Sequence, residues 1–260
     1  ENYIRYRYKG VYIYANDEFN RYSDEVIDFS KYDAEQLVQG GNSKRYAEAY
    51  DEAISEYNKA LNLDANNFNA FMGLGEVYKA RRNYSDAIES AEKAYAVASG
   101  ENKTLALTLK FEVYKAQGNW NESIETATQI IYLNSDNPYQ WYVERGYVRL
   151  QHGQYGLAVD DFNSALTGSF TSYKGTVYNL RGVGYSRLKM YPNALNDFKK
   201  ATVQGVQDGE AESSLGIYFN NLGNTYLTLK KKPEAAIALK KAAGFGNQDA
   251  ARTLRSNALK

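Results

Sequence analysis

Small, aliphatic and aromatic residues recur along this chain in a fixed order, at intervals of 34 to 41 residues. The clearest copy contains Phe71, Leu74, Gly75 and Tyr78, which are spaced so that they share one face of an α-helix. One helix pair cannot bury such a face alone and must stack on its neighbours. The pattern therefore predicts a solenoid of stacked helix pairs.

Six copies align through a small residue in the second helix, at Ala53, Ala87, Ser123, Ala158, Ala194 and Ala235. In five copies an aromatic residue precedes this slot, at Tyr50, Tyr84, Trp120, Tyr155 and Tyr191, and the sixth copy has Lys232. A first-helix slot holds Gly75, Gly146, Gly182 and Gly223, whereas the third copy has Phe111 there. Glycine costs a helix about 0.5–1 kcal/mol, so its recurrence predicts close helix packing.

The repeated pattern resembles the signature of the tetratricopeptide repeat (TPR), in which W-x2-L-G-x2-Y precedes A-x3-F and a proline. The resemblance implies an all-α protein, a right-handed α-α superhelical solenoid of about six helix pairs with a C-terminal capping helix. We assign the repeat array to residues 34–243 and the capping helix to residues 244–260. Within that last helix we expect Ala250, Leu254 and Ala258 on one side and exposed Arg252 and Arg255.

The tyrosine-rich N-terminal extension, residues 1–33, differs from the array. Residues 1–15 alternate Ile4, Tyr6 and Tyr8 with basic side chains, which predicts a strand. One interpretation is an extended arm, which packs on the first repeat or is left over from a longer protein. The other is an exposed edge that pairs with a partner strand. We expect Gly40 and Gly41 to break the helix that starts near Ala34.

Composition limits the possible partners. Lys and Arg number 31, as do Asp and Glu, which argues against a general nucleic-acid binder. No apolar run approaches the ~18 residues that a membrane span requires. The absence of cysteine and the 25 tyrosines fit an exported bacterial protein, although many cytosolic proteins also lack cysteine. Because the chain starts at Glu1 rather than Met, we expect a processed or trimmed product.

No group of residues in the sequence predicts catalysis. His152 is the only histidine and lies in a predicted turn, with no cysteine available to complete a metal site. Asp160 and Asp161 are adjacent on a predicted helix, so they point about 100° apart, and we expect both to be solvated. The sequence therefore predicts a protein that is not an enzyme and has no cofactor.

The TPR resemblance implies a concave groove, lined by the first helix of each pair, that binds an extended peptide or protein segment. The helical stripe beside the packing face supplies the candidate residues Asn69, Met72, Glu76, Lys79, Thr108, Glu112, Lys115, Tyr147, Asn179, Asn220, Asn221 and Asn224. The same stripe contains Gln140, Val143 and Thr176. We expect its amides to contribute little to packing, and either to bind a peptide main chain or to be solvated.

Two other functions stay open, namely a self-assembling structural subunit and an exported accessory protein of a transporter or enzyme that holds a small ligand. Charge is uneven along the array: residues 17–64 hold 12 acidic and 5 basic side chains, whereas residues 230–260 hold 8 basic and 2 acidic ones. Opposite ends could therefore associate weakly head to tail. Exposed charge pairs contribute little, however, which favours ends that are each solvated.

Overall fold

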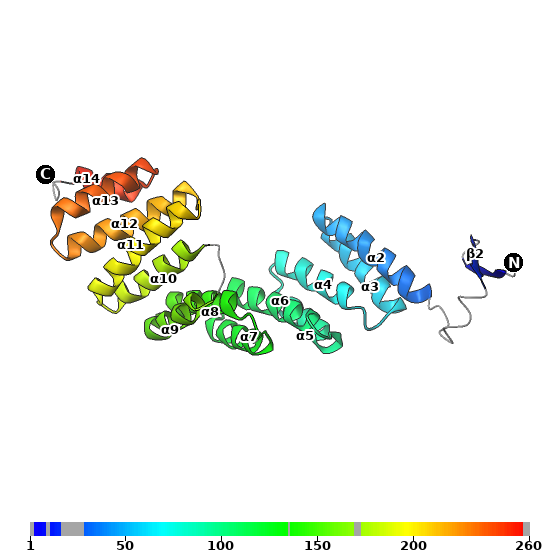
Figure 1. Cartoon of the computed structure of the whole chain (residues 1–260). Coiled ribbons are helices and arrows are strands. Elements are labelled where there is room, and N and C mark those ends of the chain that lie inside the picture. Colours follow the sequence, from blue (N-terminus) through cyan, green and yellow to red (C-terminus); the bar gives the residue numbers. More distant parts are fainter. Residues whose placement is uncertain (1–2, 9–10, 17–28, 135, 169–172, 257–260) are drawn as a thin grey trace. The chain divides into compact units, whose positions relative to one another are not determined.

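The computed structural model describes residues 3–8, 11–16, 29–134, 136–168 and 173–256, and the chain divides into two compact units, 1–77 and 78–260. Figure 1 shows successive helices arranged in pairs. The strands are β1 (Tyr3–Tyr8) and β2 (Val11–Asn16). The helices are α2 (Phe29–Tyr46), α3 (Tyr50–Leu63), α4 (Phe68–Ala80), α5 (Tyr84–Val97), α6 (Asn102–Gln117), α7 (Trp120–Leu133), α8 (Tyr139–Gln151), α9 (Tyr155–Leu166), α10 (Lys174–Arg187), α11 (Tyr191–Gln207), α12 (Glu212–Thr228), α13 (Lys232–Gly244) and α14 (Gln248–Arg255).

The N-terminal segment of the first unit contains two strands, where the alternation over residues 1–15 predicts a single one. β1 pairs with β2 in an antiparallel register that sets Tyr6 opposite Ile13. β1 thus has its pairing strand within the same segment. The part of the predicted extension at residues 17–28 lies outside the described residues.

The prediction that Gly40 and Gly41 break a helix is wrong. α2 continues through both glycines to Tyr46 and packs against α3. A Cβ atom added at Gly41 would lie 2.6 Å from Cε1 of Tyr57 in α3, and one added at Gly73 in α4 would lie 2.4 Å from the same atom. These glycines therefore admit the buried Tyr57 ring between α2 and α4, and their role is packing.

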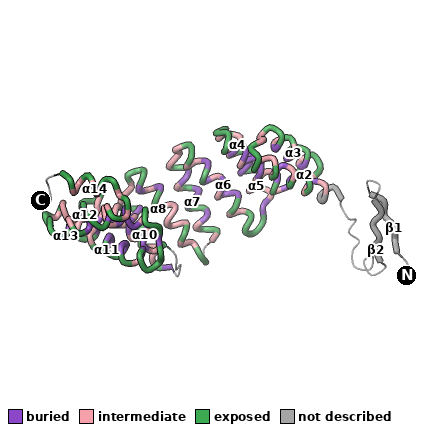
Figure 2. Tube along the Cα trace, turned by 90° about the horizontal axis from the view of Figure 1, so that it is seen from above, coloured by how far each residue is buried: buried purple, intermediate pink, exposed green. Residues whose placement is uncertain are grey.

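In the second unit each helix from α5 to α13 packs against the next one along the chain. The buried residues gather where paired helices meet, as Figure 2 shows for α10 and α11. Phe198 of α11, for example, is 1% exposed and packs with Leu222 of α12 and Ala238 of α13. This arrangement is the expected helical repeat solenoid, because each pair completes its core with the next.

Glycine on a first helix is matched by a large side chain 16 positions later on the second helix. The four matched pairs are Gly41–Tyr57, Gly146–Phe162, Gly182–Phe198 and Gly223–Leu239, where an added Cβ atom would approach the large side chain to within 2.6–2.8 Å. The third repeat reverses the sizes, since Phe111 stands opposite Ala127 in the same cluster. In this repeat the first helix thus supplies the volume that the second helix supplies elsewhere. The second repeat differs, since Gly75 and Ala91 at the same spacing are both small.

The predicted aromatic residues begin the second helices, since Tyr50, Tyr84, Trp120, Tyr155 and Tyr191 are the first residues of α3, α5, α7, α9 and α11. Two residues before each second helix the backbone has a positive φ, at Glu48, Arg82, Gly118, Gly153, Lys189 and Lys230. The following N–H bonds back to the end of the first helix, as Met190 does to Tyr185 at 2.8 Å. One left-handed turn is therefore used in all six pairs.

The final helix, α14, agrees with the expected cap. Asn247 begins it by accepting a hydrogen bond from the N–H of Ala250 at 2.9 Å. Ala250 is buried, Leu254 packs against the preceding pair, and Arg252 and Arg255 are exposed. Ala258 lies outside the described residues.

Candidate binding surface on the first helices

Polar contacts join the first helices of consecutive pairs in the second unit. Three such contacts are Lys79–Glu112 (2.5 Å), Lys115–Glu144 (3.1 Å) and Asn221–Asn179 (2.9 Å). We call the face formed by α6, α8, α10 and α12 the first-helix surface. Many side chains of the predicted stripe thus hold one repeat to the next.

The prediction that the amides add little to packing is wrong for Asn179. Its side chain is 7% exposed, and its Oδ1 atom accepts the hydrogen bond from Nδ2 of Asn221. Asn220 is half-buried, and its Oδ1 atom has no partner within the described part of the chain. Asn224 is exposed, as expected. The Asn179 side chain therefore lies against the neighbouring repeat rather than in the open groove. How the two repeats pack determines this position.

A pocket of about 200 Å³ lies between α10 and α12. Hydrogen-bonding side chains line most of it, together with two apolar ones: Val183, Ser186, Arg187, Phe198, Asn221, Asn224, Thr225 and Thr228. Asn221 and Asn224 come from the predicted stripe, and Ser186 and Val183 continue that stripe on α10. Part of the predicted stripe thus lines a polar pocket at the C-terminal end of the first-helix surface.

The other candidates are spread over both units. Asn69, Met72 and Glu76 belong to the first unit, where the Nδ2 atom of Asn69 lies 3.5 Å from Oε2 of Glu35. In the second unit, Thr108 donates a hydrogen bond to the main chain of its own helix at 2.8 Å. Tyr147 is 39% exposed, with the Lys115 ammonium 5.9 Å from its ring centre. These positions thus belong to two separate units.

A larger pocket, of about 500 Å³, lies between α8 and α10. Its lining residues are Asn134, Asn137, Tyr139, Gln140, Trp141, Val143, Glu144, Tyr173, Thr176 and Val177. Gln140, Val143 and Thr176 belong to the predicted stripe. Asn134, Asn137 and Tyr173 lie outside the helices, so the helical pattern could not identify them.

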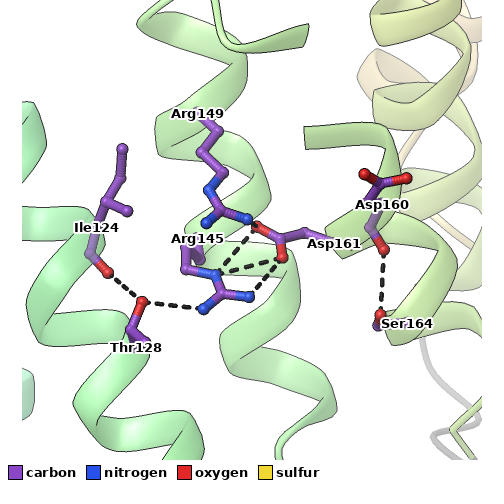
Figure 3. A network of polar contacts seen from close by, with 7 residues as sticks. All are labelled: Ile124, Thr128, Arg145, Arg149, Asp160, Asp161 and Ser164. Atoms are coloured by element: carbon purple, nitrogen blue, oxygen red, sulfur yellow. Dashed lines mark hydrogen bonds and ion pairs between the residues drawn. The ribbon is translucent and has the colours of Figure 1, made fainter. Parts of the chain in front are cut away.

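Asp161 is buried, which overturns the expectation that it is solvated. It is 2% exposed and forms ion pairs of 2.7 Å with Arg145 and Arg149 on α8. Figure 3 shows both guanidinium groups converging on Asp161, whereas exposed Asp160 points away. Arg181 and Asp197 repeat the pairing 36 positions later, also at 2.7 Å. These charges stabilise the pairing of helices within two repeats.

Glu210 connects the fifth and sixth pairs. Its carboxylate accepts hydrogen bonds from the main-chain N–H of Thr176 at 3.2 Å, from the Thr176 hydroxyl at 3.0 Å, and from the Tyr218 hydroxyl. Burial and the Glu210 carboxylate raise the pKa of Tyr218 well above its usual range. Since Tyr173 at the start of α10 provides no side-chain cap, Glu210 supplies a hydrogen-bond acceptor there.

The described residues contain no group of His, Cys, Asp and Glu side chains that could hold a metal ion. His152 is exposed at the end of α8. None of the helices in the described ranges has the length and apolar character needed to cross a membrane.

Residues 41–81 match the family described as TPR repeat. No curated protein is similar enough in sequence to count as a match. The matched segment comprises the end of α2, all of α3 and all of α4, which is where the clearest copy of the pattern lies.

Solved structures of TPR proteins share the fold. The MamA protein is 23% identical, with 68% of this chain and 93% of that chain covered and a TM-score of 0.57. YrrB, described as a TPR protein with an unusual peptide-binding site, is 20% identical, with 66% and 86% covered and a TM-score of 0.52. PilF of Pseudomonas aeruginosa is 17% identical, with 82% and 91% covered and a TM-score of 0.58.

Proposed function

Because this chain is a tetratricopeptide repeat protein, we propose that it is a non-enzymatic adaptor that binds an extended segment of another protein along the first-helix surface. Stacked helix pairs present long surfaces for holding a partner. The observation that carries the proposal is the polar pocket between α10 and α12, which both of these first helices line. The peptide-binding site of YrrB supports the same class of function.

The chemistry of this pocket suits a peptide main chain. Amide and hydroxyl groups both donate and accept hydrogen bonds, so they match the alternating N–H and C=O groups of an extended segment. Asn224 and Ser186 supply such groups in the pocket lining, and Thr228, whose hydroxyl donates to the main-chain oxygen of Asn224 at 3.0 Å, adds an acceptor. Arg187 adds a cation, which favours a segment with an acidic side chain or carbonyl oxygens at this point.

The test begins with selection of binding peptides from a random dodecapeptide library against the full chain. The affinity of a selected, fluorescently labelled peptide is then measured for two variants. Asn224→Ala removes a pocket amide, whereas Asn196→Ala removes another exposed amide, from α11, a second helix. Loss of one peptide hydrogen bond should weaken binding by about 2- to 10-fold in Asn224→Ala alone.

Two results would argue against this function. Equal affinities of the two variants for the peptide would show that the peptide does not bind in the α10–α12 pocket. Failure to select any peptide with saturable binding would argue against a peptide adaptor altogether.

A small-molecule ligand is the second candidate, and the pocket between α8 and α10 favours it. Its volume of about 500 Å³ is comparable with that of ordinary small-ligand sites. A ligand of this kind would stabilise the chain without any peptide present, so a thermal-shift screen of metabolites distinguishes the two functions.

A further inference from the structure

The pocket between α8 and α10 has one charged lining residue, the acidic Glu144, and none of its described lining residues is basic. Three aromatic rings share the lining: Tyr139, Trp141 and Tyr173. Aromatic faces attract cations, and a nearby carboxylate strengthens that attraction. The pocket therefore has the chemistry of a cation site rather than an anion site.

Two of the three aromatic walls, Tyr139 and Trp141, are fixed by their own contacts. Trp141 meets Phe111 edge to face, with ring centres 5.3 Å apart and an interplanar angle of 86°. The Tyr139 ring covers Gly168 so closely that a Cβ atom added there would lie 2.3 Å from its Cγ atom. A ligand therefore meets two walls that are already ordered, which lowers the entropy cost of binding, whereas the Tyr173 side chain is 66% exposed.

Glu144 has the capacity to bind a further cation. Its Oε2 atom lies 3.1 Å from the Lys115 ammonium, whereas its Oε1 atom accepts no hydrogen bond from the described residues. The Glu144 side chain is 35% exposed, so a ligand can reach it. Thr176, which also lines the pocket, is bonded to the buried carboxylate of Glu210 at 3.0 Å, which adds negative charge beside the site.

We propose that this pocket binds an arginine side chain of the peptide that the first-helix surface holds, an inference that rests on the proposed function. A guanidinium group is planar, stacks on aromatic rings and offers five N–H donors to carboxylate and amide oxygens. Glu144 receives the charge, the rings of Tyr139 and Trp141 contact the guanidinium faces, and Asn137 and Gln140 supply amide oxygens from the lining.

The two pockets also set a spacing for the arginine. Thr176 lines the α8–α10 pocket and Ser186 lines the α10–α12 pocket, and both belong to α10. Val177 and Val183 line the same two pockets and are six residues apart, so the separation along α10 is about 9–15 Å, which an extended peptide covers with about three to five residues. Selected peptides should therefore carry arginine about three to five residues from the part that contacts Asn224.

A small probe tests the pocket without any selected peptide. The probes are N-acetyl-L-arginine methylamide and its neutral counterpart, N-acetyl-L-citrulline methylamide, each titrated into the full ¹⁵N-labelled chain. We expect the arginine probe to shift the Trp141 indole resonance and to bind about tenfold or more tightly than citrulline. Equal affinities, or shifts confined to resonances outside this pocket, would overturn the inference.

Matched variants complete the test. Glu144→Gln keeps the shape of the side chain and removes its charge, whereas Glu122→Gln makes the same change at an exposed position of α7. The arginine probe should lose about tenfold in affinity with Glu144→Gln only. If selected peptides depend on Asn224 but not on arginine or Glu144, the arginine site is wrong and the adaptor function stands. If the arginine probe binds through Glu144 and no peptide does, the adaptor function is wrong and the arginine site stands.

Discussion

Replacement of Gly182 by valine tests the packing rule on which the repeat array depends. A Cβ atom at this position would lie 2.8 Å from Cε1 and 2.9 Å from Cδ1 of Phe198, well inside normal contact distance. Phe198 is 1% exposed and packs against α12 and α13, so its ring has little space to move away. The substitution therefore overfills the core between α10 and α11.

The magnitude follows from two opposing effects. Overpacking a core costs about 1–3 kcal/mol, and valine regains only a few tenths of a kcal/mol over glycine in helix propensity. We expect Gly182→Val to lower the free energy of unfolding by about 1–3 kcal/mol. Adding Phe198→Ala recreates the small-residue arrangement that Ala127 provides opposite Phe111, so the double variant should lose at least about 1 kcal/mol less than the two single losses combined.

Urea unfolding followed by circular dichroism at 222 nm measures these changes. Gly156→Val in α9 is the control, since Gly156 is exposed and an added Cβ atom there would have no other atom within 4 Å. The control should change stability by no more than about 0.5 kcal/mol. If Gly182→Val behaves like Gly156→Val, or if the double variant shows no coupling, close approach of the helices does not explain the glycine slot.

Three further predictions follow from particular residues. Asp161→Asn should lower the unfolding free energy by about 3–5 kcal/mol because it leaves two arginines without their buried partner, whereas exposed Asp160→Asn should stay within about 0.5 kcal/mol in the same urea assay. Lys189→Gly should raise the melting temperature and stabilise the chain by up to about 1 kcal/mol, because Lys189 has a φ of 61° at a slot where two other repeats use Gly118 and Gly153; a lower melting temperature would contradict this. Light scattering should give the same mass at low and high salt, because exposed charge pairs contribute little; association that salt reverses would instead indicate head-to-tail docking.

The sequence predicted the helix pairs because their signals are local. An aromatic residue stands at the first position of five second helices, and the small residues that follow are buried, as Ala194 and Ala201 are in α11. Glycine was harder to interpret, because the same residue ends helices and admits large side chains. Gly41 admits the Tyr57 ring of another helix, and a local sequence pattern carries no information about that contact.

The site was predicted less completely than the fold. Adjacent Asp160 and Asp161 differ only in helix phase, yet one is exposed and the other is 2% exposed. A signal for the buried ion pair was present, since Arg145 and Asp161 are spaced by 16 residues like the glycine pairs, and Arg181 and Asp197 repeat them. The depth of Asn179 depends on how α10 and α12 contact each other, which periodicity does not specify.

Photo-crosslinking is the most direct test that the first-helix surface binds a peptide. The photoreactive residue p-benzoylphenylalanine replaces Asn224 on α12 in one sample and Asn196 on α11 in the other, in the full chain. A selected peptide should crosslink at position 224, with little product at position 196, and an excess of unlabelled peptide should abolish the product. Crosslinking at position 196 with none at position 224 would contradict the account, because the peptide would then lie on the second helices.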